Sequence, residues 1–389
     1  MPNILIVVNA EWYFWSHRLP LARALRDHGC QVIIAAAVER GYQQAIEKEG
    51  FRFFRLQLRR QSSNPWREIV NLLELFRLYR KQRPDLVHHI TIKPVLYGSL
   101  AAKAACVPLV INTIPGLGYL FLQTGLRGSI LRYVASSAYR LALSGKHSHV
   151  IMQNPDDLRM FVSKKLVPVD RVTLIRGSGV NIHEFVPSPE PPGLPVVLFT
   201  GRLLWDKGLQ ELVEASRLLK KDGIRCRVVI VGVPDPENPN SVSEETVRAW
   251  QMEGIIEWWG LRNDMPKVLS LSAIVVLPSY REGVPKFLLE AASAGRPIIT
   301  TDVPGCRETV VQGENGLLVP PRDPVALSRA IRTLVCNSNL RKEMGIRSRE
   351  IAVSGFSEER IIEETLNVYR TLLGPKWPQS KAINCCSWT

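Results

Sequence analysis

Two carboxylates that could hold hydroxyl groups of a ligand lie eight residues apart in the segment 279–290. Glu282 falls in a turn after an apolar strand, and Glu290 falls in the helix that follows this turn. Pro285 suits a first helical position, so the backbone N–H groups after it would be unpaired. Such a helix start can receive a diphosphate. A ligand with hydroxyl groups on both sides of a diphosphate is a nucleotide sugar, which is the substrate that this segment predicts.

Two cations follow the end of another apolar strand, near the start of the second half of the chain. Arg202 and Lys207 come after residues 196–200, and Gly208 opens a helix. Either cation alone could be ordinary surface charge, and the Glu spacing by itself recurs in four other pairs. Because both features follow strands of one predicted sheet, they should meet at its carboxyl edge. The predicted lining of the donor pocket there is Gly283, Val284, Lys286, Phe287 and Leu288.

Short apolar strands alternate with helical stretches from the start of the chain. This alternation predicts α/β domains whose parallel sheets are covered by helices on both faces. The strands expected in the first half are 4–8, 32–36, 51–58, 86–90, 109–113 and 150–153. Those expected in the second half are 196–200, 227–231, 255–259, 274–277, 298–301 and 317–319. Helices should fill most of the intervals, and two more are expected at 339–352 and 357–373.

A proline-rich segment divides this pattern into two halves of similar size. Five prolines lie within residues 187–195, which excludes a helix or a central strand there. We therefore predict a doubly wound domain over residues 1–185, a linker at 186–195, a second doubly wound domain at 196–373 and a disordered tail at 374–389. Ligands of such sheets bind beyond the carboxyl ends of the strands, so the site should lie in the cleft between the domains.

The two donor-site segments together resemble the family 4 retaining glycosyltransferases. The resemblance rests on Gly-Arg-Leu-Leu-Trp-Asp-Lys-Gly at 201–208 and on Ser-Tyr-Arg-Glu-Gly-Val-Pro-Lys-Phe-Leu-Leu-Glu at 279–290. It implies the GT-B fold, in which two Rossmann-like domains face a cleft and the last helix returns to the first domain. It also implies that Glu290 holds the ribose of a nucleotide sugar and that Glu282 contacts its sugar. Arg202 and Lys207 would hold the diphosphate, without a metal ion or other cofactor.

Three segments of the first half resemble bacterial N-acetylgalactosaminyltransferases, capsule enzymes and O-antigen enzymes that use polyprenyl-diphosphate-linked acceptors. They are residues 12–18, which we expect to be a loop, residues 91–98 and residues 112–119. The candidates for binding the acceptor are His17, Arg18, Lys93, Gly116 and Gly118, and the candidate catalytic residues are His17, Glu282, Arg202 and Lys207. His17 and Lys93 could bind the acceptor diphosphate or assist its hydroxyl group, although a single histidine near a strand end is often structural.

The net charge of +14 lies almost wholly in the first half. Residues 1–185 hold 25 Lys and Arg against 12 Asp and Glu, and residues 186–389 hold 25 against 24. A basic half can bind a phosphorylated substrate, an anionic membrane surface or nucleic acid. The helices expected at 66–82 and 127–143 mix cations with apolar faces, which is typical of surface helices and also of helices that dock on an anionic bilayer. No known nucleic-acid-binding pattern accompanies the charge.

We therefore expect a retaining glycosyltransferase that moves a HexNAc or hexose from a UDP-sugar to a lipid-diphosphate-linked saccharide, in the synthesis of a surface polysaccharide, O-antigen or glycoprotein glycan. A UDP-sugar 2-epimerase on the same fold and a basic nucleic-acid-binding protein are the alternatives. No apolar run reaches the length of a membrane span, so we expect a cytoplasmic protein that attaches peripherally to the inner face of the membrane. Seven cysteines without a Cys-x-x-Cys pair indicate reduced thiols and no zinc site.

Overall fold

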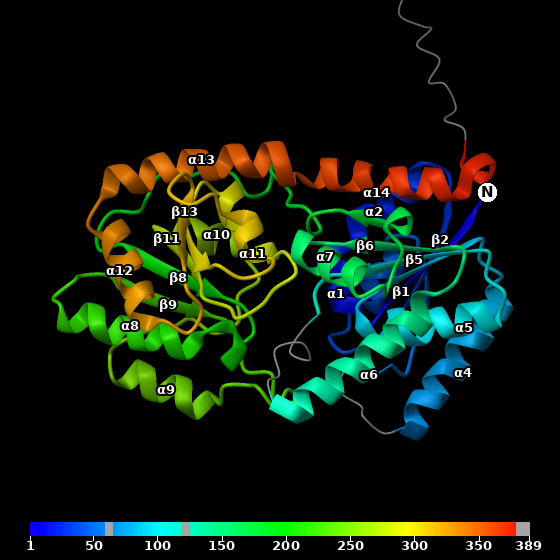
Figure 1. Cartoon of the computed structure of the whole chain (residues 1–389). Coiled ribbons are helices and arrows are strands. Elements are labelled where there is room, and N and C mark those ends of the chain that lie inside the picture. The colour runs from blue at the N-terminus through cyan, green and yellow to red at the C-terminus, as the bar shows by residue number, and fades with distance from the viewer. Residues whose placement is uncertain (59–64, 118–124, 379–389) are drawn as a thin grey trace, which may run out of the picture.

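The computed structural model describes residues 1–58, 65–117 and 125–378, which form two lobes side by side (Figure 1). Each lobe is built around a parallel sheet that helices cover on both faces. The strands are short runs rich in Val, Ile and Leu, and most of their side chains are buried. Such runs suit strands that are covered on both faces, so the expected α/β fold is confirmed.

The sheet of the first lobe has seven strands in the order β3-β2-β1-β4-β5-β6-β7. Its strands are β1 (Asn3–Val8), β2 (Gln31–Ala36), β3 (Arg52–Arg55), β4 (Leu86–Ile90), β5 (Leu109–Ile114), β6 (Ser148–Met152) and β7 (Val172–Leu174). Its helices are α1 (Glu11–His17), α2 (Leu19–Asp27), α3 (Gln43–Lys48), α4 (Pro65–Gln82), the π-helical turn η1 (Pro94–Gly98), α5 (Ser99–Ala104), α6 (Gly125–Leu143), α7 (Pro155–Ser163) and the 3-10 turn η3 (Val169–Arg171).

The sheet of the second lobe has six strands in the order β10-β9-β8-β11-β12-β13. Its strands are β8 (Val196–Thr200), β9 (Arg227–Val231), β10 (Glu257–Trp258), β11 (Ile274–Leu277), β12 (Ile298–Thr301) and β13 (Gly316–Val319). Its helices and 3-10 turns are η4 (Trp205–Lys207), α8 (Leu209–Lys221), α9 (Glu244–Met252), α10 (Met265–Ser270), α11 (Lys286–Ser293), η5 (Arg307–Thr309), α12 (Pro324–Val335) and α13 (Ser338–Phe356). The last elements of the chain are α14 (Glu358–Leu373) and the 3-10 turn η6 (Gly374–Lys376).

The chain crosses between the lobes twice, at two neighbouring places. Ile175 belongs to the core of the first lobe and Val180 to that of the second, whereas Phe356 belongs to the second core and Ile361 to the first. The two crossings are joined by hydrogen bonds, because Val180 N donates to Phe356 O at 2.9 Å and Glu358 N donates to Val180 O at 2.9 Å. Helix α14 thus returns to the first lobe, as expected, and packs beside α2 (Figure 1).

A buried histidine of β4 fixes α14 to the first lobe. His88 Nδ1 lies 2.7 Å from the hydroxyl of Tyr369 on α14, and His88 Nε2 lies 2.7 Å from Thr113 Oγ1 on β5. All three side chains are buried. Burial holds the pKa of His88 well below its ordinary value, so the imidazole is neutral and exchanges hydrogen bonds with both hydroxyls.

The structure differs from the sequence-based expectations at four places. Residues 11–17, expected to be a loop, form helix α1, and strand β7 was not predicted. The polypeptide passes between the cores at 175–180, a few residues before the predicted domain end at 185. Residues 374–376, expected to be disordered, form η6, and Trp377 packs against the first core. The remainder of that predicted tail, from 379 on, lies outside the described residues.

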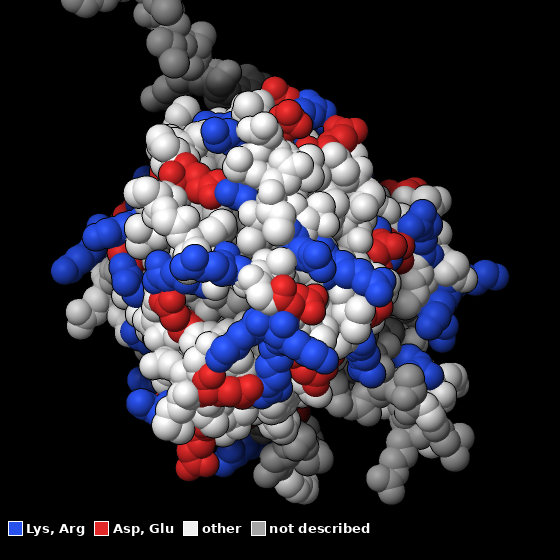
Figure 2. Space-filling model, turned by 90° about the vertical axis from the view of Figure 1, so that its left-hand side faces the viewer, with Lys and Arg blue, Asp and Glu red and all other residues white. Residues whose placement is uncertain are grey.

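The charge of the second lobe is mixed. Figure 2 shows the end of the molecule on the side of α8, α9 and α12, where Lys and Arg side chains are interspersed with Asp and Glu side chains. Ion pairs in these elements include Arg217 with Glu253 at 2.8 Å and Arg332 with Asp222 at 3.7 Å. Such pairing agrees with the near-neutral count of the second half, so the excess of positive charge belongs to the first lobe.

Candidate active site in the cleft between the lobes

Strand order brings the predicted site residues to the point where each sheet reverses its winding. In the second lobe β8 and β11 are neighbours, so the loop with Arg202 and Lys207 and the turn with Glu282 flank one crevice. In the first lobe β1 and β4 are neighbours, and α1 with His17 and the residues around Lys93 follow them. Ligands of doubly wound sheets bind at such positions.

A cleft of about 1580 Å³ separates the lobes. Both lobes line it, the first with residues of the loops after β1, β2 and β3 and of α4, and the second with the loops after β8 and β9. Among the predicted donor residues, Arg202 lies in this lining, where its Nη1 pairs with Asp235 Oδ2 at 2.9 Å. The lining also carries Arg40, Arg55, Arg67 and Arg262, together with the carboxylates of Glu39, Glu74, Asp235 and Glu237, so the charge of this cleft is mixed.

Lys207 and Glu282 are in direct contact. Lys207 Nζ donates a hydrogen bond to Glu282 Oε1, and Ser279 Oγ donates to the same oxygen at 2.7 Å. Gly208 makes this approach possible because its φ is +73° and a Cβ there would lie 2.1 Å from Pro278 O. A side chain at position 208 would therefore separate the two segments. The structure thus brings together a predicted cation and a predicted carboxylate from loops 75 residues apart.

Glu290 lies on α11, one helical turn beyond Lys286, and is partly buried. Burial raises the pKa of Glu290 to about 7, against an opposing effect of the Lys286 ammonium. Helix α11 begins at Lys286 with Pro285 as its N-cap, and no side chain among the described residues caps its first turn. Leu288 N already donates to Pro285 O at 3.0 Å, so the N–H groups available to an anion are those of Lys286 and Phe287. Pro285 precedes the helix instead of opening it.

The start of α11 also contacts the first lobe beside His17. Lys286 Nζ donates a hydrogen bond to the backbone oxygen of Ser16. His17 Nδ1 lies 2.6 Å from Ser16 Oγ, and its ring stacks on Tyr13 with centroids 4.3 Å apart. Burial, with the neighbouring Lys286 and Arg18 cations, holds the pKa of His17 well below its ordinary value. His17 is therefore a neutral imidazole at the interface of the lobes.

The backbones of two glycines meet across the cleft. A Cβ on Gly116 would lie 3.0 Å from Gly283 N, and one on Gly283 would lie 1.4 Å from Pro115 O. Only glycine permits this approach, so the predicted acceptor segment and the predicted donor turn touch each other directly. Gly118, the other glycine predicted to bind the acceptor, lies outside the described residues.

Lys93 and Arg18 have surroundings that the sequence did not reveal. Lys93 Nζ pairs with Glu68 Oε1 of α4 at 2.8 Å, and both side chains are largely buried. Arg18 is 4% exposed, and its Nε and Nη2 have no hydrogen-bond partner among the described residues. Its charge lies close enough to His17 and Tyr13 to shift the pKa of each. Arg18 also hydrogen-bonds the Tyr13 side chain, so only part of its guanidinium lacks a partner among the described residues.

Three residues of the predicted donor lining have side chains turned toward the core of the second lobe. Val284 is 8% exposed, Leu288 is fully buried, and Phe287 packs against the same core. Any contact of Val284 and Leu288 with a donor must therefore come from their backbone atoms. Within the described parts of the chain, no group of three His, Cys, Asp or Glu side chains is arranged to hold a metal ion.

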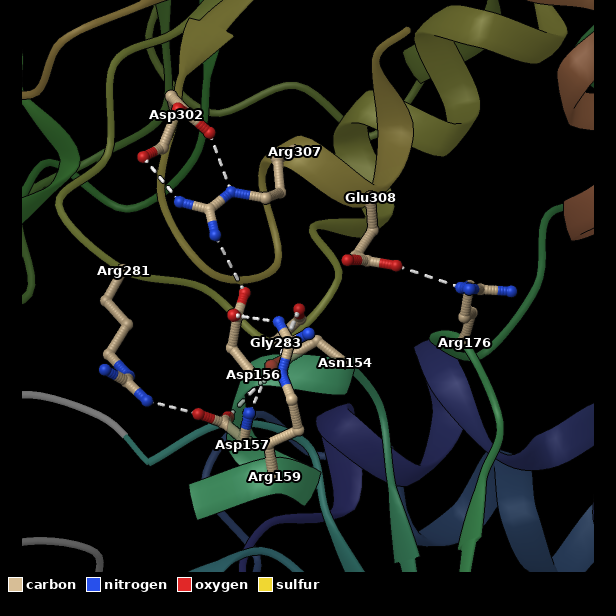
Figure 3. Close-up of polar contacts among 10 residues, drawn as sticks. All are labelled: Asn154, Asp156, Asp157, Arg159, Arg176, Arg281, Gly283, Asp302, Arg307 and Glu308. Carbon is tan, nitrogen blue, oxygen red and sulfur yellow. Dashed lines mark hydrogen bonds and ion pairs between the residues drawn. The ribbon is translucent and has the colours of Figure 1, made fainter.

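Sequence reasoning missed a polar network between the lobes, which Figure 3 shows. Arg281 of the donor turn pairs with Asp157 of α7, and Arg307 of η5 pairs with Asp156 at 3.0 Å. Asn154 Nδ2 lies 3.4 Å from Gly283 O. The sequence offered a partial signal, because Asn-Pro-Asp-Asp at 154–157 follows a predicted strand and is a typical helix start. The partner of such a helix start cannot be inferred from that pattern.

Glu308 lies in an ion pair at the crossing between the lobes. Its Oε2 accepts from Arg176 Nε at 2.9 Å, and its side chain is 12% exposed (Figure 3). The pair joins the loop after β7 to η5.

No helix of the described residues has the length and apolar content that a membrane span requires.

The chain matches known families in both lobes. Residues 194–337 match the family described as glycosyl transferases group 1, and residues 3–154 match the family described as glycosyl transferase 4-like. These two matches cover the donor segments in the second lobe and most of the first lobe. They agree with the resemblance drawn from the residues at 201–208 and 279–290.

Individual known proteins are similar to this chain over most of their length. The N,N'-diacetylbacillosaminyl-diphospho-undecaprenol alpha-1,3-N-acetylgalactosaminyltransferase of Campylobacter jejuni is 28% identical over 91% of this chain and 95% of its own. The UDP-Gal:alpha-D-GlcNAc-diphosphoundecaprenol alpha-1,3-galactosyltransferase of Escherichia coli is 24% identical over 78% and 79%. The structure of sucrose-phosphate synthase from Thermosynechococcus elongatus superposes with a TM-score of 0.78 at 20% identity, over 96% of this chain and all of its own. This chain therefore belongs to the group 1 glycosyltransferases, family 4, and has the GT-B fold.

Proposed function

We propose that this enzyme is a retaining glycosyltransferase that takes a HexNAc or hexose from a UDP-sugar and adds it to a lipid-diphosphate-linked saccharide. The contact between Lys207 and Glu282, beside the uncapped start of α11, is the observation that carries the proposal. A cation, a carboxylate and unpaired amide groups converge there, and a nucleotide sugar needs such groups for its diphosphate and its hydroxyls. The similarity to enzymes named for UDP-Gal and for diphospho-undecaprenol saccharides supports both substrate classes.

The residues of the second lobe would act mainly by stabilising charge on the leaving group. In the transfer, the bond between the anomeric carbon and the diphosphate breaks, and a bond to the acceptor hydroxyl forms. Negative charge develops on the departing diphosphate, where Arg202, Lys207 and the amide groups at the start of α11 would stabilise it. Glu290 would accept hydrogen bonds from the ribose, and Glu282, held by Lys207, would orient the sugar.

The first lobe would position the acceptor. In a retaining transfer through internal return, the acceptor hydroxyl attacks on the face from which the diphosphate leaves. A neutral His17 would accept a hydrogen bond from that hydroxyl, and the contact of the neighbouring Ser16 with Lys286 at the start of α11 supports this role. Arg18 and the basic excess of this lobe would attract the diphosphate of the acceptor.

We also propose that the first lobe docks peripherally on an anionic membrane surface, at its cytoplasmic face. Exposed apolar residues recur at helical spacing on α4 and again on α6. They are Trp66, Ile69, Val70 and Leu73 on α4, and Ile130, Tyr133, Val134 and Leu141 on α6. Rows of this kind on helices that also carry arginines are typical of interfacial docking, and the acceptor lipid resides in the membrane.

A donor screen tests the proposal. Purified protein is incubated with UDP-, GDP- and ADP-sugars, with and without a polyprenyl-diphosphate-linked saccharide, and nucleotide release and glycan product are measured. We expect release from a UDP-sugar that depends on the acceptor. Interconversion of the UDP-sugar without an acceptor would instead indicate an epimerase.

We further propose that no metal is needed, so addition of EDTA should leave transfer unchanged.

Two substitutions test the donor-site roles. Lys207→Ala removes a cation from the diphosphate site, and Glu290→Ala removes the predicted ribose partner, so each should lower transfer by roughly 10²-fold or more. Lys342→Ala, on an exposed face of α13, serves as the control and should transfer at the wild-type rate. Wild-type turnover by the Lys207 or Glu290 variant would contradict the assignment of the donor site.

A further inference from the structure

The turn that carries Glu282 is supported on one side by its own lobe. Tyr280 N donates to Asp206 O at 2.9 Å, and Glu282 N donates to Pro304 O at 3.1 Å. The hydroxyl of Tyr280 donates to Glu211 Oε1 on α8 at 2.7 Å. These bonds attach both ends of the turn to the second lobe, and the Gly283 carbonyl also packs against Gly305 of that lobe, where a Cβ would lie 2.0 Å from Gly283 O. Arg281, in contrast, extends to the first lobe.

The other side of the same turn rests on the start of α7 in the first lobe. Arg281 Nη2 donates to Asp157 Oδ1, and Asn154 Nδ2 lies 3.4 Å from Gly283 O (Figure 3). The two charged side chains are largely removed from water, since Asp157 is 1% exposed and Arg281 is 15% exposed. Residues on both sides of Glu282 are therefore held by one helix of the opposite lobe.

The start of α7 fixes the carboxylate of Asp157 before Arg281 reaches it. Asn154 is the N-cap of α7, and its Oδ1 accepts from Asp157 N at 2.8 Å. Its Nδ2 donates to Asp157 Oδ2 at 2.9 Å, which orients that carboxylate. Oδ1 of Asp157 then remains to accept the hydrogen bond from Arg281. Because one partner is preorganised in this way, formation of the ion pair fixes Arg281, and with it the turn, in one position.

We propose that Asp157 and Arg281 are positioning residues for the transfer reaction, through which α7 of the first lobe holds Glu282 in its reactive place. The proposal rests on the role proposed above for Glu282 in binding the donor sugar. It implies that the donor site is complete only while the lobes are in contact at α7. A nucleotide would still bind to the second lobe alone, but its sugar would not be held for attack.

A second ion pair from the same helix provides a matched control. Arg307 Nη1 pairs with Asp156 Oδ2 at 3.0 Å, and it thus also joins α7 to the second lobe. Arg307 belongs to η5, not to the turn of Glu282, and its Nε is held within its own lobe by Asp302 Oδ1 at 2.7 Å. Loss of this pair weakens the contact between the lobes without releasing Arg281. The two pairs therefore separate positioning of the turn from simple adhesion of the lobes.

The test is a double-substitution cycle with separate measurements of turnover and nucleotide binding. Asp157→Asn and Arg281→Gln are made singly and together, and kcat, KM for the UDP-sugar and the calorimetric Kd of UDP are measured. We expect each single variant to lower kcat about 10²-fold, since displacement of a reacting group by 1 Å has an effect of that size. The Kd of UDP should change less than about threefold, and the double variant should be no slower than the worse single variant.

Two further variants distinguish positioning of the turn from a general effect on the contact between the lobes. Arg281→Lys keeps the charge and should recover part of the lost kcat, whereas Arg307→Gln should change kcat less than about threefold. A circular dichroism spectrum and a Tm like those of the wild type show that a slow variant is folded, and retention of UDP binding shows in addition that its second lobe is intact. The proposal is overturned if Asp157→Asn and Arg281→Gln turn over like the wild type, or if Arg307→Gln is equally slow. If Lys207→Ala also leaves transfer intact, the proposed function itself has failed, and not only the positioning role.

Discussion

Burial sets the ionisation of two residues at the border of the lobes, His17 and Glu290. Removal from water lowers the pKa of the imidazole and raises that of the carboxylic acid, so both groups favour their neutral forms. The charges that remain for a diphosphate then come from Arg202, Lys207 and Lys286. Arg202 and Lys207 are paired with Asp235 and Glu282, so a diphosphate would compete with these carboxylates for the two cations. Hydrogen bonds from a ribose would favour the ionised form of Glu290.

The raised pKa of Glu290 makes the stability of the ligand-free protein depend on pH. Its pKa of about 7 lies above the value of about 4.3 for an unfolded glutamate, so the folded protein holds the proton more tightly. This contribution is fully present below about pH 4 and is lost as the pH rises through 7. Between pH 5 and pH 8 the wild type should lose about 2 kcal/mol of stability relative to Glu290→Gln.

Thermal denaturation across this pH range measures the difference. Glu245→Gln, at an exposed position of α9, is the control and should follow the wild type at every pH. A difference in Tm between wild type and Glu290→Gln that stays constant from pH 5 to pH 8 would show that Glu290 does not titrate there. Saturating UDP should reduce the difference if the ribose hydroxyls bind the carboxylate.

The sequence predicts the bounds of a helix or strand correctly where the residues of that element alone carry its hydrophobic pattern. The expected strands at 86–90, 196–200, 227–231, 274–277 and 298–301 have the same bounds in the structure. Helix α1 was missed because residues 12–18 resemble a segment that we expected to be a loop, while the stability of this helix comes from packing of Phe14 into the core. Propensity is a weak guide for such a seven-residue helix, because tertiary contacts decide.

The turn of the donor site depends on glycine at position 283. A Cβ on this residue would lie 1.4 Å from Pro115 O, so Gly283→Ala must move the turn away from the first lobe. We expect transfer to fall at least about 10²-fold, with a smaller effect on the Kd of UDP. Gly355→Ala in α13 is the matched control, because a Cβ there meets open space and alanine favours a helix. Equal turnover of the two variants would be incompatible with the close approach.

The exposed rows on α4 and α6 predict how the enzyme binds vesicles. Replacing Trp66 and Tyr133 by Ala, or Arg132 and Arg140 by Gln, should reduce cosedimentation with vesicles of phosphatidylglycerol and phosphatidylethanolamine. Each arginine near an anionic surface contributes about 1 kcal/mol, so the second change should weaken binding roughly tenfold or more.

A control distinguishes docking through α4 and α6 from nonspecific adsorption of the protein to lipid. Met252 is 84% exposed on α9 of the second lobe, and Met252→Ala should sediment with vesicles like the wild type. Vesicles of neutral lipid should bind all variants weakly. Unchanged sedimentation of the α4 and α6 variants would remove the docking surface from the proposal.

The arrangement of the whole molecule depends on contacts that no local pattern reveals. The motif at 279–290 predicted the donor turn, because strand, turn and helix start are consecutive in the chain. The pairing of Arg281 with Asp157 joins residues 124 positions apart and depends on how the lobes face each other. For the same reason Lys93 was predicted to face a diphosphate, while in the structure it pairs with Glu68 of a different helix.

Helix α14, near the end of the chain, stabilises the first lobe. Tyr369→Phe removes the hydroxyl that contacts His88 Nδ1 and leaves a buried polar nitrogen unpaired, which should cost about 1–3 kcal/mol. Chemical denaturation monitored by circular dichroism measures the loss, and the Kd of UDP should not change because the proposed donor site belongs to the other lobe. Tyr133→Phe, on an exposed face of α6, should be neutral. Equal stability of both variants would mean that the His88 contact contributes nothing.

Because α14 completes the core of the first lobe, this lobe is built from two separate stretches of the chain. A chimera that joins residues 1–180 of this chain to the donor half of a relative would pair its sheet with a foreign terminal helix. A graft that also carries residues 357–378 would keep Ile361, Leu366 and Tyr369 against their own partners. Exchange of acceptor specificity between such enzymes therefore requires two junctions, both placed where the chain passes Val180 and Ser357.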